Sequence, residues 1–193
     1  MPDETDSAPP TSGVSPGLDI DANRRISNYS PSERRARVAW SIGKLVFRLI
    51  PRPFYGARAG WLRLFGARIG KNCQIYPTVR IFMPSQLEIG DWSSVGDGAI
   101  LYNLAGLKIG ERVTISQGAH LCAGTHDFRD PRMPLIRSTI TVGDEAWLCA
   151  DCFIGPEVTI GARAVVAARA VAMRDVPAGV IVAGNPARQV GER

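Results

Sequence analysis

Histidine and cysteine are scarce in this sequence, whose 193 residues include two histidines and four cysteines. The cysteines are Cys73, Cys122, Cys149 and Cys152, and the last two form a C-x-x-C pair typical of redox or metal sites. No second pair and no neighbouring histidine completes a ligand set for that motif. We therefore expect reduced cysteines that fill small apolar spaces, no metal site, and a location in the cytoplasm.

Long apolar runs and a basic leader are absent too. The most apolar run, residues 38–50, contains Lys44 and Arg48, so it is too short and too charged to cross a bilayer. The chain opens on Met1-Pro-Asp-Glu, which is acidic and unlike a secretory signal. No zinc-finger spacing or aromatic RNA-binding signature occurs, so we expect no nucleic-acid partner.

Two segments precede the regular part of the chain. Residues 1–28 are rich in Pro, Gly, Ser and Asp without periodicity, which predicts a disordered tail. Residues 29–66 combine apolar residues at helical spacing with a basic face, and predict one helix to residue 50 and another at about 57–65. The net charge of +5 admits anionic partners. This amphipathic helical segment either caps the end of the fold, lies on an anionic membrane surface, or does both.

A six-residue repeat over residues 69–175 organises the rest of the chain. Such a step fits neither a helix nor a long strand, but it fits short strands joined by corners, with aliphatic side chains stacked inside. We place five coils of three steps, and 14 of the 15 inward positions are Ile, Val or Leu. The inward positions are Ile69, Ile75, Ile81, Ile89, Val95, Leu101, Ile109, Ile115, Leu121, Val142, Leu148, Ile154, Ile160, Val166 and Ala172. The prediction is an all-β fold, a parallel β-helix.

Glycine follows the first inward position of every coil, as at Gly143 and Gly161. A corner there either needs unusual dihedral angles or leaves no room for a Cβ atom.

One long insertion interrupts the repeat. The first two advances between coils add two residues each at the same corner, whereas the third adds 15 and creates a loop at 123–139. Long loops inside compact repeats are usually functional, and this one carries His126. Prolines and glycines then end the repeat, and residues 176–193 form a C-terminal extension.

The repeats, the G-T-H-D motif of the loop and the V-P-A-G-V-I-V-A-G-N-P-A ending resemble the hexapeptide-repeat acyltransferases. The nearest group is the maltose and galactoside acetyltransferase type, and within it the colanic-acid and exopolysaccharide O-acetyltransferases. The resemblance covers about residue 29 to the end. It implies a left-handed coil of triangular section, a homotrimer with three active sites between neighbouring coils, and acetyl-CoA as the donor. The left hand comes from the resemblance alone, because parallel crossovers are usually right-handed.

The implied reaction moves an acetyl group from acetyl-CoA to a sugar hydroxyl of a surface polysaccharide or its lipid-linked precursor. That hydroxyl must lose a proton as it attacks, and an imidazole suits this task at neutral pH. His126 matches the catalytic histidine of the family, although a loop histidine can also simply bond a backbone carbonyl. His120 directly precedes inward Leu121 and is expected on an outer face or at a subunit contact.

Three further residues match acceptor-side positions of the family. Asn103 aligns with an acceptor-contacting asparagine, or else bonds its own backbone at a corner. Trp147 aligns with a tryptophan of the cleft between donor and acceptor, or else packs between subunits. Asp127, like Asp130, either orients the imidazole, binds the acceptor, or is a turn residue.

The donor side is implied by matches near the end of the chain. Arg174 matches a basic position near the phosphates of coenzyme A, and Arg188 matches one near the 3′-phosphate. Ala168 matches a position whose backbone contacts the pantetheine arm, and small side chains at 150 and 167 would let that arm lie flat. The family's serine after the cleft tryptophan is Ala150 here, so its side-chain bond is lost.

Other functions stay open on the sequence alone. The acceptor could be a free sugar or an antibiotic, and the chain could be a non-catalytic trimeric scaffold. A carbonic anhydrase of the γ class needs three metal-binding histidines, and this chain has two. The sequence also leaves open whether the N-terminal helices contact the inner face of the plasma membrane or a partner protein.

Overall fold

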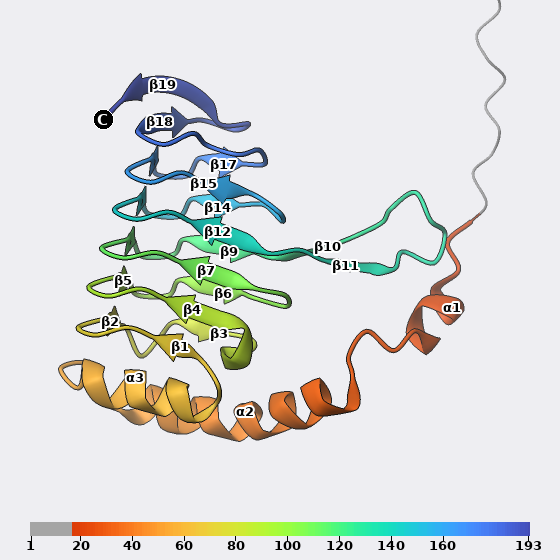
Figure 1. Cartoon of the computed structure of the whole chain (residues 1–193). Helices are drawn as coiled ribbons and strands as arrows, with labels where there is room; N and C mark the ends of the chain where they lie inside the picture. Colours follow the sequence, from red (N-terminus) through yellow and green to blue (C-terminus); the bar gives the residue numbers. More distant parts are fainter. Residues whose placement is uncertain (1–16) are drawn as a thin grey trace, which may run out of the picture.

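The computed structural model describes residues 17–193, so the first sixteen residues of the expected tail lie outside the described part of the chain. Three helices precede a column of short strands, and one hairpin projects from the side of the column (Figure 1). The strands form three parallel sheets wound as a left-handed β-helix, which confirms the predicted fold class. The column has about six turns rather than about five.

Each full turn contributes one strand to each of three sheets, here named A, B and C. Sheet A contains β1 (Arg68–Ile69), β4 (Leu87–Ile89), β7 (Leu107–Ile109), β12 (Ile140–Val142) and β15 (Thr159–Ile160). Sheet B contains β2 (Gln74–Ile75), β5 (Ser94–Val95), β8 (Thr114–Ile115), β13 (Trp147–Leu148), β16 (Val165–Val166), β18 (Val180–Ala183) and β19 (Arg188–Glu192). Sheet C contains β3 (Arg80–Ile81), β6 (Ile100–Tyr102), β9 (His120–Cys122), β14 (Phe153–Ile154) and β17 (Val171–Ala172).

The inside of the column is filled by the residues that the repeat predicted. All of the predicted inward positions are buried, the most exposed being Ile69 at 7%. Equivalent residues of successive turns stand above one another, as in the pairs Leu101–Leu121 and Leu121–Ile154. Each such aliphatic side chain contributes about 1.5–3 kcal/mol when buried, so the stack is the main source of stability of the column.

The close spacing of the turns explains the glycines. A Cβ atom on Gly143 would lie 2.6 Å from the backbone nitrogen of Ala162, and one on Gly161 would lie 2.3 Å from that of Ala178. Positive φ angles fall instead on non-glycine residues two positions later, such as Glu145. The lack of room for a Cβ atom, rather than an unusual dihedral angle, therefore requires glycine here.

All of the length changes in the repeat occur at the corner between sheets C and A. Residues 82–86 include the 3₁₀ helix η1 (Pro84–Gln86), and residues 103–106 form the next corner. The long insertion forms an antiparallel hairpin of β10 (Gly124–His126) and β11 (Leu135–Arg137), which extends away from the column (Figure 1).

The repeat continues one turn beyond its predicted end at residue 175. Val176 forms a parallel bridge with Ile160, and Val182 in β18 pairs with Val166. Strand β19 then returns antiparallel to β18. The predicted extension at 176–193 thus begins as a sixth turn, which its prolines and glycines concealed.

Residues 20–25, which fall in the expected disordered tail, differ from the prediction. Residues 20–25 form helix α1 (Ile20–Arg25), whose N-cap Asp19 accepts a hydrogen bond from the backbone of Ala22 at 2.9 Å. The backbone nitrogen of Asp19 donates to the carbonyl of Pro131 in the hairpin at 2.8 Å. Composition predicted disorder, whereas a side-chain cap and a contact far along the chain order this segment.

Two helices cap the first turn, as predicted. Helix α2 (Pro31–Leu49) starts with a capping box between Ser30 and Glu33, and it buries Trp40 and Phe47 against the column. Helix α3 (Tyr55–Leu64) follows and buries Leu62. No helix among residues 17–193 is both long and apolar enough to cross a bilayer.

A fully buried arginine fastens this cap. Arg58 in α3 donates to the carbonyls of Ile50, Pro51 and Arg52 after α2, and to that of Ile75 in the first turn, at 2.6–3.0 Å. Burial lowers the pKa of its guanidinium, while the four carbonyls accept hydrogen bonds from its nitrogens.

Candidate active site

His126 ends strand β10 on the projecting hairpin. Its side chain is exposed, and its Nδ1 lies 2.7 Å from the carbonyl oxygen of Met133. A carbonyl can only accept, so Nδ1 donates its proton to this oxygen, and Nε2 has no hydrogen-bond partner among residues 17–193. A hydrogen bond to a backbone carbonyl is also what a purely structural loop histidine would make. Here it leaves Nε2 of an exposed side chain without a partner in the part of the chain that the structure describes.

The Met133 carbonyl is held from a second side. Asn23 in α1 donates from Nδ2 to this oxygen at 2.9 Å and to the carbonyl of Arg132 at 2.6 Å. Met133 has a positive φ of 43°, which is uncommon for a residue with a side chain. Helix α1 and His126 thus share one acceptor in a turn that adopts an unfavourable backbone conformation.

The base of the hairpin is tied to the start of α2. Arg137 in β11 donates to Glu33 at 2.5 Å and to the carbonyl of Asn28 at 2.9 Å. The hydrogen bond from Arg137 is the largest effect that lowers the pKa of the Glu33 carboxyl to about 2. Arg137 and Arg37 also lie over the ring of Tyr29, at 5.4 and 4.0 Å from its centroid.

The loop aspartates serve the turn of the hairpin. Asp127 accepts a hydrogen bond from the backbone of Arg129 at 3.0 Å, and Asp130 pairs with Arg132 at 2.7 Å. Hydrogen bonds from Arg132 lower the pKa of the Asp130 carboxyl. Among residues 17–193, neither carboxylate bonds His126, so the Met133 carbonyl, not an aspartate, orients the ring in this chain.

Asn103 lies where the acceptor was expected, at the corner of sheets C and A, but its side chain is fully buried. Its Oδ1 accepts from the backbone nitrogens of Phe82 and Met83 at 3.1 Å each, and its Nδ2 donates to the Met83 carbonyl at 2.6 Å. These bonds join two neighbouring corners. They favour the corner role for Asn103 over a direct contact with an acceptor.

Trp147 projects from the outer face of sheet B with 46% of its surface exposed, and its Nε1 donates to Ser116 at 3.0 Å. In a triangular column, sheet B lies opposite the corner that carries His126. Figure 1 shows the hairpin leaving the column on the side away from β2 and β5. One chain therefore does not bring Trp147 and His126 together.

Small residues line the corner between sheets B and C. Ala150 and Ala168 occupy successive turns there, and the backbone nitrogen of Arg169 donates to the Ala150 carbonyl at 2.9 Å. Ala168 is exposed, and Ala167 beside it is half-buried. The corner offers exposed backbone with short side chains, as a flat-lying pantetheine arm requires.

Arg174 and Arg188 line one hollow at the C-terminal end of the column. The hollow has a volume of about 460 Å³ and is bounded by β17, β18 and β19. Both side chains are exposed, and neither forms a salt bridge within residues 17–193. Two residues matched separately from the sequence are thus brought to a single cation-lined hollow.

The remaining candidates are structural. His120 lies on the outer face of sheet C with its ring 5.2 Å from that of Phe153, and burial lowers its pKa. The four cysteines are unpaired, and burial raises the pKa of Cys152 to about 12. Within residues 17–193, no group of three or more His, Cys, Asp or Glu side chains could hold a metal ion.

Sequence reasoning missed Asn23, Met133 and the Glu33–Arg137 pair. A short D-I-D-A-N helix start was the one local signal for α1, and it was hidden in a Pro- and Ser-rich tail. Met133 contacts His126 through its backbone carbonyl, which every residue type has, so the sequence contains no signal for this role.

The triangular column, the inserted hairpin and its histidine define a hexapeptide-repeat β-helix.

No family model matches the chain. The chain is 40% identical over 159 residues to the "Putative colanic acid biosynthesis acetyltransferase WcaF" of Escherichia coli (strain K12), covering 82% of this chain and 87% of the relative.

Solved structures agree with this relationship. The hexapeptide-repeat-containing acetyltransferase VCA0836 from Vibrio cholerae is 26% identical, with a TM-score of 0.79 over 84% of this chain and 93% of that chain. The complex of VCA0836 with acetyl coenzyme A, from Vibrio cholerae O1 biovar eltor, is 25% identical, with a TM-score of 0.78 over 86% and 92%. The chain belongs to the hexapeptide-repeat acetyltransferase family.

Proposed function

We propose that this chain transfers an acetyl group from acetyl-CoA to a sugar hydroxyl during biosynthesis of a surface polysaccharide, with His126 as the general base. The observation that carries the proposal is the exposed imidazole whose Nδ1 is bonded to the Met133 carbonyl. The name of the relative from Escherichia coli refers to colanic acid biosynthesis. The structure of VCA0836 with acetyl coenzyme A supports the choice of donor.

In the proposed reaction, Nε2 of His126 takes the proton of the sugar hydroxyl as its oxygen attacks the thioester carbonyl. The tetrahedral intermediate collapses, the carbon–sulfur bond breaks, and the coenzyme A thiolate receives the proton from the imidazolium. The Met133 carbonyl stabilises that imidazolium through the Nδ1 proton. General-base assistance of this kind contributes about 10²–10⁴-fold to the rate.

The donor lies along the corner of sheets B and C in this proposal. Ala168 presents its backbone to the pantetheine arm, while Arg174 and Arg188 face the phosphates of coenzyme A. The shared hollow of about 460 Å³ supports both arginine assignments. Unpaired guanidinium groups suit phosphate because their donors match its oxygens in a fork geometry.

A homotrimer completes the site. Trp147 and the donor corner lie away from the hairpin of the same chain, so the base of one subunit meets the donor wall of a neighbour. Equal mixing of a His126→Ala chain with an Arg174→Glu/Arg188→Glu chain, followed by refolding together, should restore part of the activity that each lacks alone. No recovery in verified mixed trimers would contradict a shared site.

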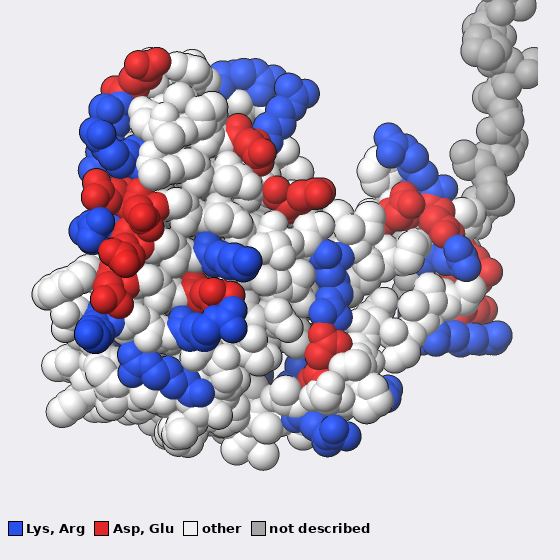
Figure 2. All heavy atoms as spheres, viewed as in Figure 1, with Lys and Arg blue, Asp and Glu red and all other residues white. Residues whose placement is uncertain are grey.

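The proposed acceptor is membrane-borne, and the helical cap supports this. Residues 34–87 contain eleven Lys and Arg and no Asp or Glu, while the rest of the chain holds twelve Lys and Arg against eighteen acids. On α2, the face opposite the buried Trp40 and Phe47 exposes four aliphatic residues by 58–80%. They are Val38, Ile42, Leu45 and Leu49. The surface of the cap at the bottom of Figure 2 is largely uncharged, with basic side chains around it.

The central test is acetyl transfer by the wild type and by His126→Ala. We expect the variant to lose at least about 10²-fold in kcat while binding coenzyme A normally. A panel of polysaccharide fragments, free sugars and an antibiotic acceptor, read by NMR, identifies the acetylated hydroxyl. An unchanged rate in the variant would refute the base assignment, and preference for a small free acceptor would refute the polysaccharide assignment.

A further inference from the structure

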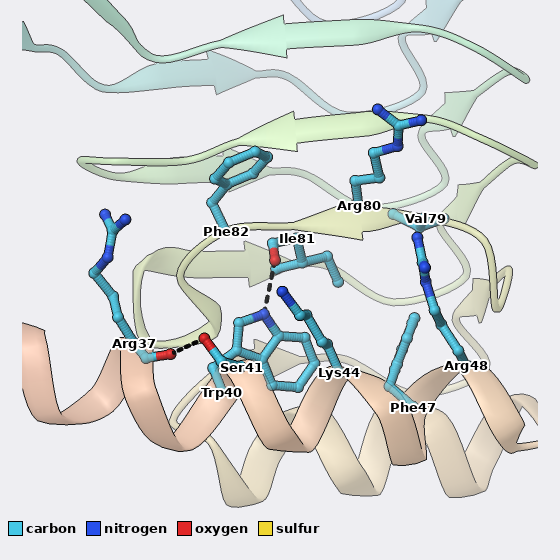
Figure 3. A pocket seen from close by; sticks show the side chains of 10 residues that line it. All are labelled: Arg37, Trp40, Ser41, Lys44, Phe47, Arg48, Val79, Arg80, Ile81 and Phe82. Carbon is cyan, nitrogen blue, oxygen red and sulfur yellow. Dashed lines mark hydrogen bonds between the residues drawn. The ribbon is translucent and has the colours of Figure 1, made fainter.

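A groove between α2 and the first turn of the column is lined by four cations. Arg37, Lys44 and Arg48 leave α2 on one side and point toward β3, and Arg80 comes from β3 itself (Figure 3). The groove has a volume of about 310 Å³. Among residues 17–193, none of these four side chains forms a salt bridge. These four cations therefore line the groove without a protein counter-ion.

The floor of the groove is apolar and rigid. Trp40 donates from Nε1 to the Ile81 carbonyl at 2.7 Å and is buried together with Phe47. Phe82 lies at one end of the groove. Its ring packs edge-on against that of Tyr102, with the two ring centroids 4.6 Å apart. A low-dielectric floor strengthens the interaction between a bound anion and the cations around it.

One donor at the groove has no partner. Nη1 of Arg37 is shielded from solvent and makes no hydrogen bond with any of residues 17–193. An unsatisfied guanidinium donor is unfavourable, and a rotation of the Arg37 side chain away from Tyr29 would let a phosphate oxygen in the groove accept from it.

The groove adjoins both the catalytic hairpin and the apolar face of the cap. Arg37 shares the ring of Tyr29 with Arg137 of the hairpin. The aliphatic stripe from Val38 to Leu49 runs along the same helix. A ligand with a phosphate in the groove could thus place a lipid on the stripe and a sugar on the hairpin side.

We propose that this groove binds the pyrophosphate group of a lipid-linked glycan acceptor, a substrate class that rests on the proposed function. Four unpaired cations match the charge of a pyrophosphate better than that of a single phosphodiester. The exposed aliphatic stripe beside them favours a lipid-linked source over a soluble nucleotide or a nucleic acid, which carry no lipid chain.

Calorimetry with three probes tests the site in the full chain: geranyl pyrophosphate, inorganic pyrophosphate and geraniol. We expect geranyl pyrophosphate to bind at least about tenfold more tightly than either other probe, because only it engages both cations and stripe. Lys44→Ala/Arg48→Ala should weaken its binding at least about tenfold, and Arg80→Ala should also weaken it. The pair Arg34→Ala/Arg35→Ala, on the same helix outside the groove, removes equal charge and should change binding less than about twofold.

Several results would overturn the proposal. They are equal effects of the two variant pairs, equal affinity for inorganic and geranyl pyrophosphate, tighter binding of a single-stranded RNA than of geranyl pyrophosphate, and displacement of geranyl pyrophosphate by coenzyme A. Thermal melts confirm that the exposed substitutions leave the fold intact. Acetyl transfer to a phosphate-free sugar is measured with the wild type and the groove variants. This activity does not use the groove, so it tests the proposed function separately. If transfer persists while geranyl pyrophosphate fails to bind, only the groove assignment is wrong.

Discussion

The orientation of His126, the proposed general base, depends on a residue more than one hundred positions away. Asn23 donates two hydrogen bonds to the hairpin turn, one of them to the carbonyl that orients His126. A net contribution of about 0.5–1.5 kcal/mol per hydrogen bond is enough to shift the turn between ordered and frayed forms. Helix α1 therefore contacts the carbonyl that holds the His126 ring, and we predict that it helps to position this side chain.

Replacing Asn23 by Ala should lower kcat about tenfold and leave KM for acetyl-CoA unchanged, because the donor residues lie elsewhere. Steady-state kinetics measure both constants. Arg24→Ala on the same helix changes an exposed side chain and is the matched control. Equal losses in the two variants, or a loss confined to KM, would show that Asn23 does not position His126.

The Glu33–Arg137 pair makes stability depend on pH. The pKa of the Glu33 carboxyl falls from 4.5 to about 2 on folding, so its contribution is present above pH 4.5 and is lost as the pH falls toward 2. After allowance for solvent screening this amounts to about 1–2 kcal/mol. Glu33→Gln retains the capping geometry but removes the charge.

Denaturant unfolding at several pH values checks this expectation. The difference in unfolding free energy between wild type and Glu33→Gln should shrink between pH 4.5 and pH 2. Ser30→Ala, which removes the cap but not the ion pair, should lower stability by about 1 kcal/mol above pH 4.5 and should keep most of this effect at pH 2. A constant difference for Glu33→Gln would mean that the ion pair contributes nothing.

At the scale of elements, the spacing of successive turns limits side-chain size. Gly143→Ala places a Cβ atom 2.6 Å from the backbone of the next turn, so we expect a loss of about 1–3 kcal/mol. Gly60→Ala in α3 meets no atom within 4 Å and should stabilise the helix by about 0.5–1 kcal/mol. Thermal melts compare the two, and similar shifts would contradict the role of close spacing.

The column could be predicted from the sequence because its signal is local and repeated. Within each coil the inward positions recur every six residues, and all of them, from Ile69 to Ala172, are buried. The start of α2 could also be predicted, since Ser30 and Glu33 form their bond within one turn.

What the sequence could not show depends on contacts between distant segments. Helix α1 is ordered through the hairpin, and the sixth turn is hidden by turn-forming residues that also serve as corners. Asn103 matched an acceptor position, yet its amide is used by the backbone of the preceding corner. Residue type alone does not reveal whether an asparagine is free.

At the scale of the whole molecule, the excess of positive charge and the exposed aliphatic stripe of α2 both lie at the end that carries the cap. The aliphatic stripe of α2 faces away from the column, so burying it in lipid needs no rearrangement. Deleting the cap would also expose the core beneath Trp40 and Phe47. Point substitutions on the stripe therefore test lipid binding more specifically than a deletion does.

Ile42→Asp/Leu49→Asp should reduce flotation with vesicles of phosphatidylglycerol and phosphatidylcholine at least fivefold, because each buried aliphatic side chain contributes about 1.5–3 kcal/mol. Acetyl transfer to a soluble sugar should be unchanged. Val190→Asp, which alters an exposed apolar residue at the other end of the column, serves as the control. Undiminished flotation of the double variant would show that the aliphatic stripe is not the lipid contact.

The direction of strand β19 affects whether molecules can associate end to end at high concentration. A β-helix that stacks its own turns offers its last turn as a template on which another chain could continue. The direction of β19 is opposite to that of every other strand in sheet B, so a parallel turn of a second molecule cannot extend that sheet in register. The helical cap covers the other end. A second molecule could therefore not continue the parallel ladder of sheet B or reach the first turn beneath the cap, which disfavours the growth of fibres by end-to-end addition.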